Sequence, residues 1–389
     1  MSVSRPAGLW LISLAAFSSM ASMRVCDPML VGLSQEFGVS VGEASQAISA
    51  FALAYGTLQL FYGPLGDRLG KLRVINAAVF ACALFSALTS IASDFHWLVL
   101  ARALMGASAA GIIPLSMAWL GDQVGYEQRQ ETLAKLMSAT VTGMMAGQWF
   151  GGWAAEALGW RHAFVVLALM FASAAALLFV RMGPQRRVPI RREGSYAQQA
   201  LGSLRLLRVA RVRWVLGVTA IEGALAFGTL AFVPSLLVQQ LHLSAAWAGG
   251  LMALYGVGGL LYSQFARHWL ARFGERGLAR LGSRLVAAGL LLLAWAPWAL
   301  LAALGCLAAG LGFYMLHNTL QTQATQMAPE ARGSAVTLFA CLLFFGQSCG
   351  VLLVAFAVDG GGLRWTYTLA ALGMVLLGLE ITRKVQLRA

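Results

Sequence analysis

A run of 45 consecutive residues without a formal charge most constrains what this chain can fold into. From Leu285 to Pro329 there is no Asp, Glu, Lys or Arg, and the stretch WAPW, Trp295 to Trp298, interrupts the run. About 20 apolar residues let a helix cross the ~30 Å of hydrocarbon in a bilayer, and a helix satisfies its own backbone hydrogen bonds there. The run therefore predicts two consecutive membrane-spanning helices joined by a short turn.

Similar segments occur along the whole chain. Of its 389 residues, 59% are hydrophobic and 11% are charged, whereas soluble proteins carry roughly 25% charged residues. The five cysteines lie inside apolar segments without C-x-x-C spacing, which favours small buried residues over a disulfide or a metal site. The predicted spans are 9–33, 43–64, 73–92, 97–120, 132–156, 162–181, 214–238, 246–267, 283–297, 299–323, 333–357 and 365–382.

The distribution of Lys and Arg predicts how the spans are oriented. Basic residues remain on the cytoplasmic side of short loops. With the N-terminus inside, that side and the two tails hold 24 of the 28 basic residues. The opposite side has two basic residues, Arg161 and Arg364. The remaining two, Arg24 and Arg102, lie within spans. We therefore expect a bacterial-type inner (plasma) membrane protein with both termini cytoplasmic, and the net charge of +13 requires no nucleic acid as a partner.

A basic segment divides the predicted spans into two sets of six. Residues 181–213 hold nine arginines and one acid, which is typical of a cytoplasmic linker beside anionic lipid. We predict an N-terminal six-helix half at 1–182, a cytoplasmic linker at 183–213 and a C-terminal six-helix half at 214–389. The segment after the second span is weakly similar in sequence to the segment after the eighth span, but its acid has no clear equivalent there. Two related halves of this kind are the organisation of transporters that rock about a central site.

The stretch GPLGDRLGKLR, residues 63–73, concentrates charge and glycine directly after the second span. Asp67 can meet the positive N-terminal end of a neighbouring helix, and such a contact can form in one conformation and break in another. A solvated turn that obeys the positive-inside rule is the alternative. The stretch resembles the loop signature of the major facilitator superfamily, which implies a conformational latch. The latch residues are Gly63, Asp67, Arg68, Gly70 and Lys71.

Two further motifs carry the same resemblance. LARALMGASAAG matches a superfamily pattern through Arg102, and GMMAGQWFGG is similar to the helix-packing motif of drug/proton antiporters, with Gln148 where proline is usual. Glycines allow close helix packing, and the resemblance implies packing between the two halves at the periplasmic side. The glycines of this motif are Gly143, Gly147, Gly151 and Gly152.

The chain thus resembles the 12-span drug/proton antiporter and sugar-efflux permease group. This resemblance implies an all-α membrane protein with 12 transmembrane helices. They would form two six-helix halves that are pseudo-twofold related, with inverted 3+3 repeats. It also implies alternating access, in which the two halves expose a central site to one side of the membrane at a time.

Ionisable groups inside spans mark ion or substrate paths, because they are costly in hydrocarbon. Asp27 lies in the first span with Arg24 three residues earlier on the same helical face, and Arg102 enters the fourth span at a similar depth. The resemblance implies a proton-coupling role for Asp27 and Arg102; the alternative is a static structural network. Glu222 lies deep in the seventh span, and three roles stay open for it. It is a second proton site, it binds a cationic group of the substrate, or it is a buried acid that stays protonated.

Other polar residues inside the spans predict a substrate cavity. His317 titrates near neutral pH when unperturbed, but it has no Cys or carboxylate neighbour in sequence, so we expect no metal. No G-x-x-x-x-G-K-[ST] stretch is present, which favours an ion gradient over nucleotide as the energy source. The expected cavity residues are Arg24, Gln59, Gln148, His317, Asn318, Gln321 and Gln347.

The resulting hypothesis is a proton-coupled efflux transporter for small amphipathic molecules such as drugs, sugars or metabolites. We expect it to act as a monomer in the lipid bilayer, with small-molecule substrate and protons as partners and no cofactor. An uptake symporter for a nutrient or organic anion is the alternative, because Arg24 and Arg102 can bind a carboxylate or phosphate. An enzyme is not expected, since no H-E-x-x-H and no Ser-His-Asp set occurs in the spans.

Overall fold

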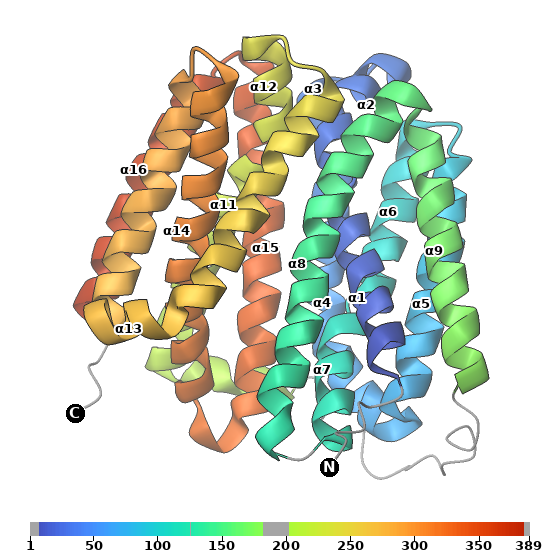
Figure 1. Ribbon diagram of the computed structural model, residues 1–389, viewed down its shortest axis with the longest axis vertical. Helices are drawn as coiled ribbons and strands as arrows, with labels where there is room; N and C mark the ends of the chain where they lie inside the picture. The colour runs from blue at the N-terminus through green and yellow to red at the C-terminus, as the bar shows by residue number, and fades with distance from the viewer. Residues whose placement is uncertain (1–7, 125, 182–201, 385–389) are drawn as a thin grey trace.

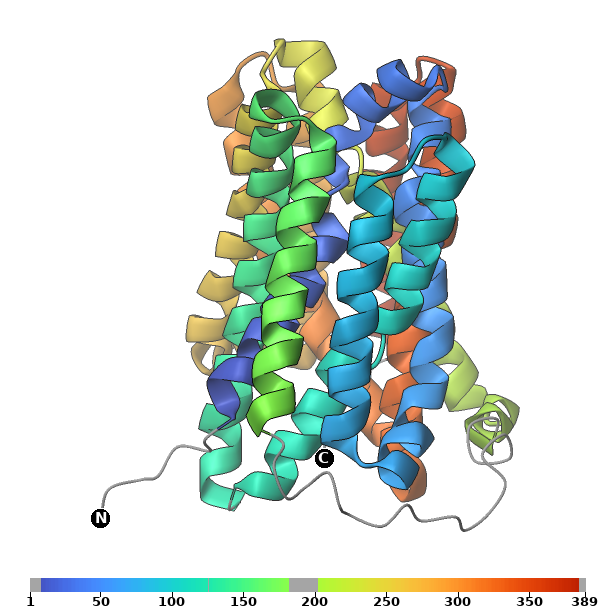
Figure 2. The same cartoon turned by 90° about the vertical axis from the view of Figure 1, so that its right-hand side faces the viewer.

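Long helices make up almost all of the structure. This computed structural model describes residues 8–124, 126–181 and 202–384, which contain no strand. Figures 1 and 2 show the helices running side by side along a common axis. Among the described residues, nine helices are long and apolar enough to cross a membrane. The predicted fold class, an all-α membrane protein, is confirmed.

The first half of the bundle contains the first six predicted spans. The first and fourth spans are each made of two helices separated by a short break. The helices of this half are α1 (Leu9–Arg24), η1 (Asp27–Met29), α2 (Leu30–Phe37), α3 (Val41–Ala44), α4 (Gln46–Leu69), α5 (Lys71–Ser90), α6 (Phe95–Ala109), α7 (Ile112–Gln123), α8 (Tyr126–Ala157) and α9 (Trp160–Arg181).

The second half contains the other six predicted spans. Its helices are η3 (Ser203–Arg208), α11 (Ala210–Leu230), α12 (Val233–Leu241), α13 (Ala245–Trp295), α14 (Ala299–Gln326), η4 (Pro329–Ala331), α15 (Arg332–Asp359) and α16 (Leu363–Lys384). Part of the predicted linker, residues 183–201, lies outside the described residues, and α11 begins before the predicted end of that linker.

The predicted spans 246–267 and 283–297 lie on a single helical element, α13, so the loop expected between them is itself helical. Gly274 alone has a non-helical backbone there, with φ +64°. This left-handed conformation suits glycine, which has no Cβ to clash. The two arms of α13 turn back at this residue, as Figure 1 shows at the lower left of the bundle.

Proline follows the helix breaks in the first and seventh spans. Pro28 lies in η1, between α1 and α2, and Pro234 lies in the first turn of α12. Proline has no backbone N–H and fits only the first turn of a helix without strain, so it favours a new helix start at both places. Because the first and seventh spans correspond between the two halves, the breaks occupy equivalent positions beside the centre of the bundle.

We call the end of the bundle where α1 begins and α16 ends the proximal face, and the opposite end the distal face. At the distal face the two halves are joined by hydrogen bonds. Oδ1 of Asp359 accepts from the backbone N–H of Gly42 at 2.9 Å, and Oδ2 accepts from Oγ of Ser40 at 2.7 Å. Oε2 of Glu156 accepts from the N–H of Ala246 at 3.1 Å. These contacts close the distal face.

At the proximal face a cavity of about 600 Å³ separates the halves. Its walls come from α4 and α7 of the first half, from Ser203 and from the start of α15. The structure is therefore open between the halves at the proximal face and closed at the distal face. One of the two conformations of an alternating-access transporter has this shape.

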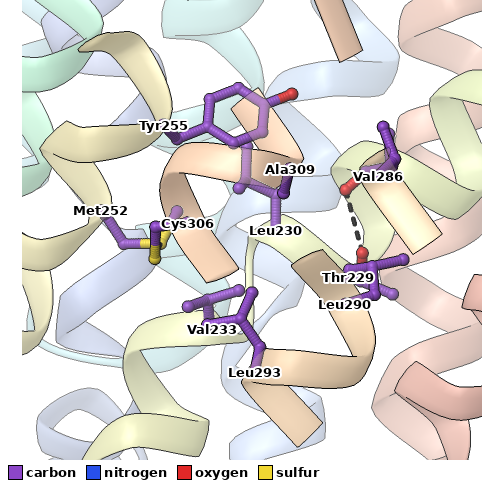
Figure 3. Close-up of a pocket in the computed structure, with 11 residues that line it drawn as sticks. Thr229, Leu230, Val233, Met252, Tyr255, Val286, Leu290, Leu293, Cys306 and Ala309 are labelled. Carbon is purple, nitrogen blue, oxygen red and sulfur yellow. Dashed lines mark hydrogen bonds between the residues drawn. The ribbon is translucent and has the colours of Figure 1, made fainter. Parts of the chain in front are cut away.

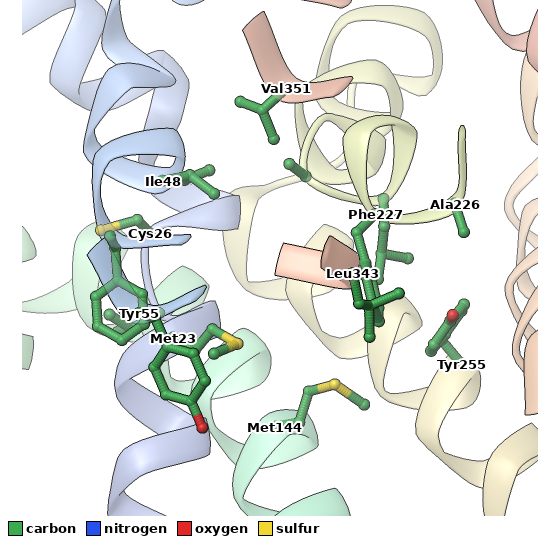
Figure 4. Packing of buried hydrophobic residues seen from close by; sticks show 14 of the residues in the cluster. Met23, Cys26, Ile48, Tyr55, Met144, Ala226, Phe227, Tyr255, Leu343 and Val351 are labelled. Atoms are coloured by element: carbon green, nitrogen blue, oxygen red, sulfur yellow. The ribbon is translucent and has the colours of Figure 1, made fainter. Parts of the chain in front are cut away.

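Apolar side chains from both halves fill the space between the cavity and the distal face. Figure 4 shows Met23, Tyr55 and Met144 of the first half facing Phe227 and Leu343 of the second. These five side chains are buried. The packed interior positions the few buried polar groups described next, because an uncompensated polar group is costly in such surroundings.

Candidate functional site

Asp27 and Arg24 form a buried ion pair at the break between α1 and α2. Asp27 begins η1, directly before Pro28, and its exposed fraction is 0%. Nη1 of Arg24 donates to Oδ2 of Asp27 at 3.4 Å, while Nε of Arg24 and Oδ1 of Asp27 have no partner. A buried charge that loses its partner is strongly destabilised. The protonation state of Asp27 therefore affects the position of Arg24.

Gln148 of α8 completes this cluster from the neighbouring helix. Its side chain is buried, and Nε2 donates to Oδ2 of Asp27 at 3.4 Å. The sequence predicted Gln148 as a residue of the substrate cavity and did not connect it to Asp27. The structure brings the two side chains together although they are 121 residues apart. We call Arg24, Asp27 and Gln148 the acid cluster.

Arg102 lies beside the acid cluster, but its hydrogen bonds go elsewhere. Its Nη1 donates to the carbonyl of Ser22 at 2.9 Å, and its Nε donates to the carbonyl of Ala47 at 3.2 Å. The guanidinium also lies over the ring of Phe51, 4.4 Å from the centroid. Arg102 thus links α6 to α1 and α4, and it acts on Asp27 only through longer-range attraction. Arg24, which the sequence placed on the same helical face as Asp27, makes the ion pair in this conformation.

Arg24 connects the acid cluster to the other half of the bundle. Its guanidinium lies over the ring of Phe227 in α11, 4.6 Å from the centroid. A cation in this position is attracted by the ring face, and the attraction is stronger away from water. The sequence gives no signal for this contact, because the two residues lie in different halves. A change in the charge of Asp27 can therefore alter a contact with the second half.

Glu222 and His317 form a second buried acidic site, between α11 and α14. Oε2 of Glu222 lies 3.0 Å from Nδ1 of His317, and Glu222 is fully buried. The His317 ring stacks on Phe313 at 5.0 Å and packs against Phe339 at 5.3 Å. The sequence singled out both Glu222 and His317 and did not pair them.

Several buried polar atoms near this pair have no hydrogen-bond partner among the residues that the structure describes. They are Oε1 of Glu222, the hydroxyl of Tyr255, and both polar atoms of the Gln347 side chain. Tyr255 interacts electrostatically with both Arg24 and Glu222. Because buried polar groups normally have partners, these atoms are candidates for contacts with a bound molecule. We call Glu222, Tyr255, His317 and Gln347 the polar cluster.

A small apolar cavity lies next to the polar cluster, inside the second half. Thr229, Met252, Tyr255 and Cys306 are among its lining residues, as Figure 3 shows. Its volume is about 10 Å³, which is near the lower limit for one water molecule. This cavity is too small for cargo, so a cargo site requires the halves to move or side chains to shift.

The predicted latch residues lie at the proximal cavity. Gly63, Asp67 and Lys71 line it, across from Gly333 and Ser334 at the start of α15. Lys71 forms an ion pair with Asp122 of α7 at 2.6 Å. Gly70 takes φ +94°, a conformation that favours glycine. A Cβ added to Gly63 would meet nothing within 4 Å, so no helix packs closely against Gly63 in this conformation.

The remaining predicted cavity residues do not converge on one point. Gln59 lines the proximal cavity, and its Oε1 has no partner. Nδ2 of Asn318 donates to the hydroxyl of Tyr262 at 2.8 Å, and Gln321 is exposed. Gln59 can therefore contact a molecule that enters from the proximal face, whereas Asn318 is already engaged within the second half.

The glycines of the helix-packing motif place α8 between two other helices. A Cβ on Gly143, Gly147 or Gly151 would meet the backbone of α1, in the same half. Only Gly152 packs on the other half, where a Cβ would meet the carbonyl of Ala245. Figure 1 shows α8 between α1 and α13. The motif thus serves packing within the first half more than packing between the halves.

The segment after the eighth span carries its acid after the turn glycine, whereas Asp67 lies three residues before Gly70. Glu275 follows Gly274 and accepts a hydrogen bond from Nε2 of Gln323 at 2.8 Å. In the first half Lys71 follows Gly70 in the same way and pairs with Asp122. The turn geometry is thus repeated in the second half with different side chains, which explains why the repeat is weak in sequence.

Comparison with known proteins identifies the family. The model of the Major Facilitator Superfamily matches residues 12–346, most of the chain. The chain belongs to this superfamily. Its members are transporters, and the fold of two six-helix halves agrees with the structure described above. The resemblance predicted from the loop signature is confirmed.

Individual members of the superfamily match over most of their length. The inner membrane transport protein YnfM of Escherichia coli K12 is 25% identical over 91% of this chain and 84% of that protein. The purine ribonucleoside efflux pump NepI of Escherichia coli O127:H6 is 22% identical, over 92% and 89%. The crystal structure of the nucleoside transporter NupG superposes with a TM-score of 0.79 at 14% identity, covering 97% of this chain and 99% of that one.

Proposed function

We propose that this member of the superfamily is a proton-coupled exporter of small amphipathic molecules. One observation carries the proposal: the acid cluster in the first half contacts the second half through Arg24 and Phe227. Coupling requires a titratable group whose protonation state changes a contact with the other half, and Asp27 can do so through Arg24. Small-molecule substrate and protons would be its partners, and one chain would be the working unit because its two halves enclose the site.

In the proposed cycle the proximal face is cytoplasmic, so this structure is the inward-open state. A proton from the outside reaches Asp27 when the distal face is open. Protonation removes the charge that holds Arg24 and biases the halves toward inward opening. The proton then leaves to the cytoplasm and cargo enters. Asp67 closes the proximal face by meeting the start of α15, which lies across the cavity.

The polar cluster is the proposed cargo site. Its unpartnered donors and acceptors lie beside aromatic rings, among them Phe227 and Phe313, whose centroids are 4.8 Å apart. Such a site suits a molecule with a flat ring and neutral hydrogen-bonding groups, since rings stack and buried amides need partners. Because NepI is a purine ribonucleoside efflux pump, purine ribonucleosides are the first cargo to test.

A specific observation favours a second candidate, uptake of an organic anion with a proton. Nε of Arg24 and Nη2 of Arg102 are buried without a partner. A carboxylate or phosphate could accept from both groups. In this candidate the same acid cluster still carries the proton, but cargo and proton move in the same direction.

The test uses everted membrane vesicles with an acid interior and a fluorescent pH probe. Purine ribonucleosides, cationic dyes and sugar acids are added one at a time. An exporter releases protons when its cargo is added, and Asp27→Asn should abolish this release. Glu330→Gln, which changes an exposed acid outside the cluster, is the matched control. No proton release in wild-type vesicles, together with accumulation of a labelled anion by intact cells, would replace the export proposal with the uptake candidate.

A further inference from the structure

Gln148 occupies a position where the resembling antiporter motif has proline, and the change alters α8. Proline in a helix interior removes a hydrogen bond and bends the helix. With glutamine, α8 continues without a break from Tyr126 to Ala157. The side chain at this position is 1% exposed and reaches the carboxyl group of Asp27. The replacement therefore gives α8 both a straight backbone and a polar contact with the acid cluster.

The backbone of α8 at Gln148 also contacts the second half. A Cβ added to Gly249 of α13 would meet the carbonyl oxygen of Gln148. Four residues further along α8, Gly152 packs against Ala245, and Glu156 then accepts from the N–H of Ala246. We call this line of contacts between α8 and α13 the distal seam. Gln148 is thus the residue that contacts Asp27 with its side chain and the distal seam with its backbone.

An amide suits this place because it can pair with a carboxyl group in either protonation state. An ionised Asp27 accepts from Nε2, whereas a protonated Asp27 donates its O–H to Oε1 after the amide rotates by half a turn. The bond to the ionised form is the stronger of the two, because one partner is charged. Arg24, by contrast, pairs well only with the ionised form.

Several other groups act electrostatically on Asp27 or respond to it. They lie on α1 and in the break after it, on α6 and on α16. These groups are Arg24, Cys26, Arg102 and Tyr367.

We propose that Gln148 is a positioning residue of the proton site, which holds Asp27 against α8 and links its protonation state to the distal seam. The proposal rests on the proposed role of Asp27 in proton coupling, and it does not depend on the direction of transport. Gln148 is not among the residues that line the proximal cavity. Its effect should therefore appear in the pH dependence of the conformational change.

The test measures the distance across the distal seam in the reconstituted protein without cargo, as a function of pH. Spin labels are placed at Leu158 and Trp247, which are exposed at the distal ends of α8 and α13, in a cysteine-free background. We expect acid pH to favour the closed seam in the wild type. Because Gln148→Leu removes a bond that favours the ionised carboxyl group, it should move the midpoint of the transition to higher pH, by about one pH unit.

Gln148→Glu separates a role at the proton site from a role in packing. The side chain has the same shape, and its protonated form can pair with Asp27 as the amide does. This variant should therefore behave like the wild type at acid pH. At higher pH it should depart from the wild type, because two carboxylates cannot both ionise at this distance. Ser138→Ala, which removes an exposed hydroxyl on α8 that bonds its own helix, should leave the midpoint unchanged.

Two results would overturn the proposal. The first is a wild-type distal seam whose distance does not depend on pH. The second is a Gln148→Leu protein with the wild-type midpoint, which would assign Gln148 to packing alone. If the midpoint shifts as expected while no cargo releases protons from vesicles, then Gln148 keeps its role and only the export proposal fails.

Discussion

Removing the carboxylates that join the two halves at the distal face should open that face. Asp359 accepts two hydrogen bonds from the first half. Glu156 of the first half accepts one hydrogen bond from the second half. Each of these exposed, charge-assisted bonds contributes roughly 0.5–1 kcal/mol. Losing all three in Asp359→Ala with Glu156→Ala costs about 2 kcal/mol. The ratio of distal-open to distal-closed protein should then rise about 30-fold, at 1.4 kcal/mol per tenfold.

Accessibility of a buried thiol reports this ratio. Val351 is fully buried in α15, eight residues before Asp359 and therefore about 12 Å deeper along the helix. In a background without native cysteines, Val351→Cys is labelled by a membrane-impermeant maleimide added at the distal face. The double variant should react about 30-fold faster than the parent, provided that opening and closing are fast relative to labelling.

Glu43→Ala is the matched control for this experiment. Glu43 is also an acid at the distal face, but its side chain accepts from the backbone N–H of Ser40 within the first half. Its loss should leave the labelling rate unchanged. Labelling of the double variant at the parent rate would refute the reasoning, and so would equal acceleration in Glu43→Ala.

Two further predictions concern the packing and the polar pair. Gly147→Val should lower the free energy of unfolding by about 1–3 kcal/mol, because its Cβ would overlap the backbone of Ala21. Gly63→Val, at a site with open space, should leave the melting temperature unchanged. Equal losses of stability in the two variants would contradict the packing described. His317→Leu should destabilise by about 1–3 kcal/mol, because Oε2 of the buried Glu222 loses its hydrogen-bond partner. Glu222→Leu in the same chain should restore most of the loss by removing the unpaired carboxyl group. A thermal-unfolding cycle with strictly additive effects would show that the pair is not coupled.

The spans were predictable from sequence because the physics that sets them is local. An uncharged segment long enough to cross the bilayer is visible in the sequence itself, as in the run that ends at Pro329. The turns at Gly70 and Gly274 belong to the same local class, although only the first has a recognisable signature. The helical loop within α13 was missed because charged residues between two apolar segments do not by themselves end a helix.

The contacts between distant helices were not predictable in the same way. Gln148 and Asp27 are 121 residues apart, and Asp359 and Ser40 are 319 residues apart. Which side chains meet depends on how each helix is rotated and shifted along its axis, and small residues such as Gly147 fix both by close packing. The pairing of Arg24 with Asp27 was accessible from sequence because the two lie three residues apart, whereas the contacts of Arg102 with the carbonyls of Ser22 and Ala47 were not.

The central claim is that the release of a proton from Asp27 is coupled to the binding of cargo at the polar cluster. Calorimetric titration of the purified protein with its cargo, in two buffers of different ionisation enthalpy, counts the protons released on binding. The account predicts that about half a proton leaves per bound cargo molecule at the midpoint of the pH profile, where half of the Asp27 carboxyl groups carry a proton, and that Asp27→Asn still binds cargo but releases none. Release of the same number of protons by wild type and Asp27→Asn, or of none by wild type at any pH, would contradict it.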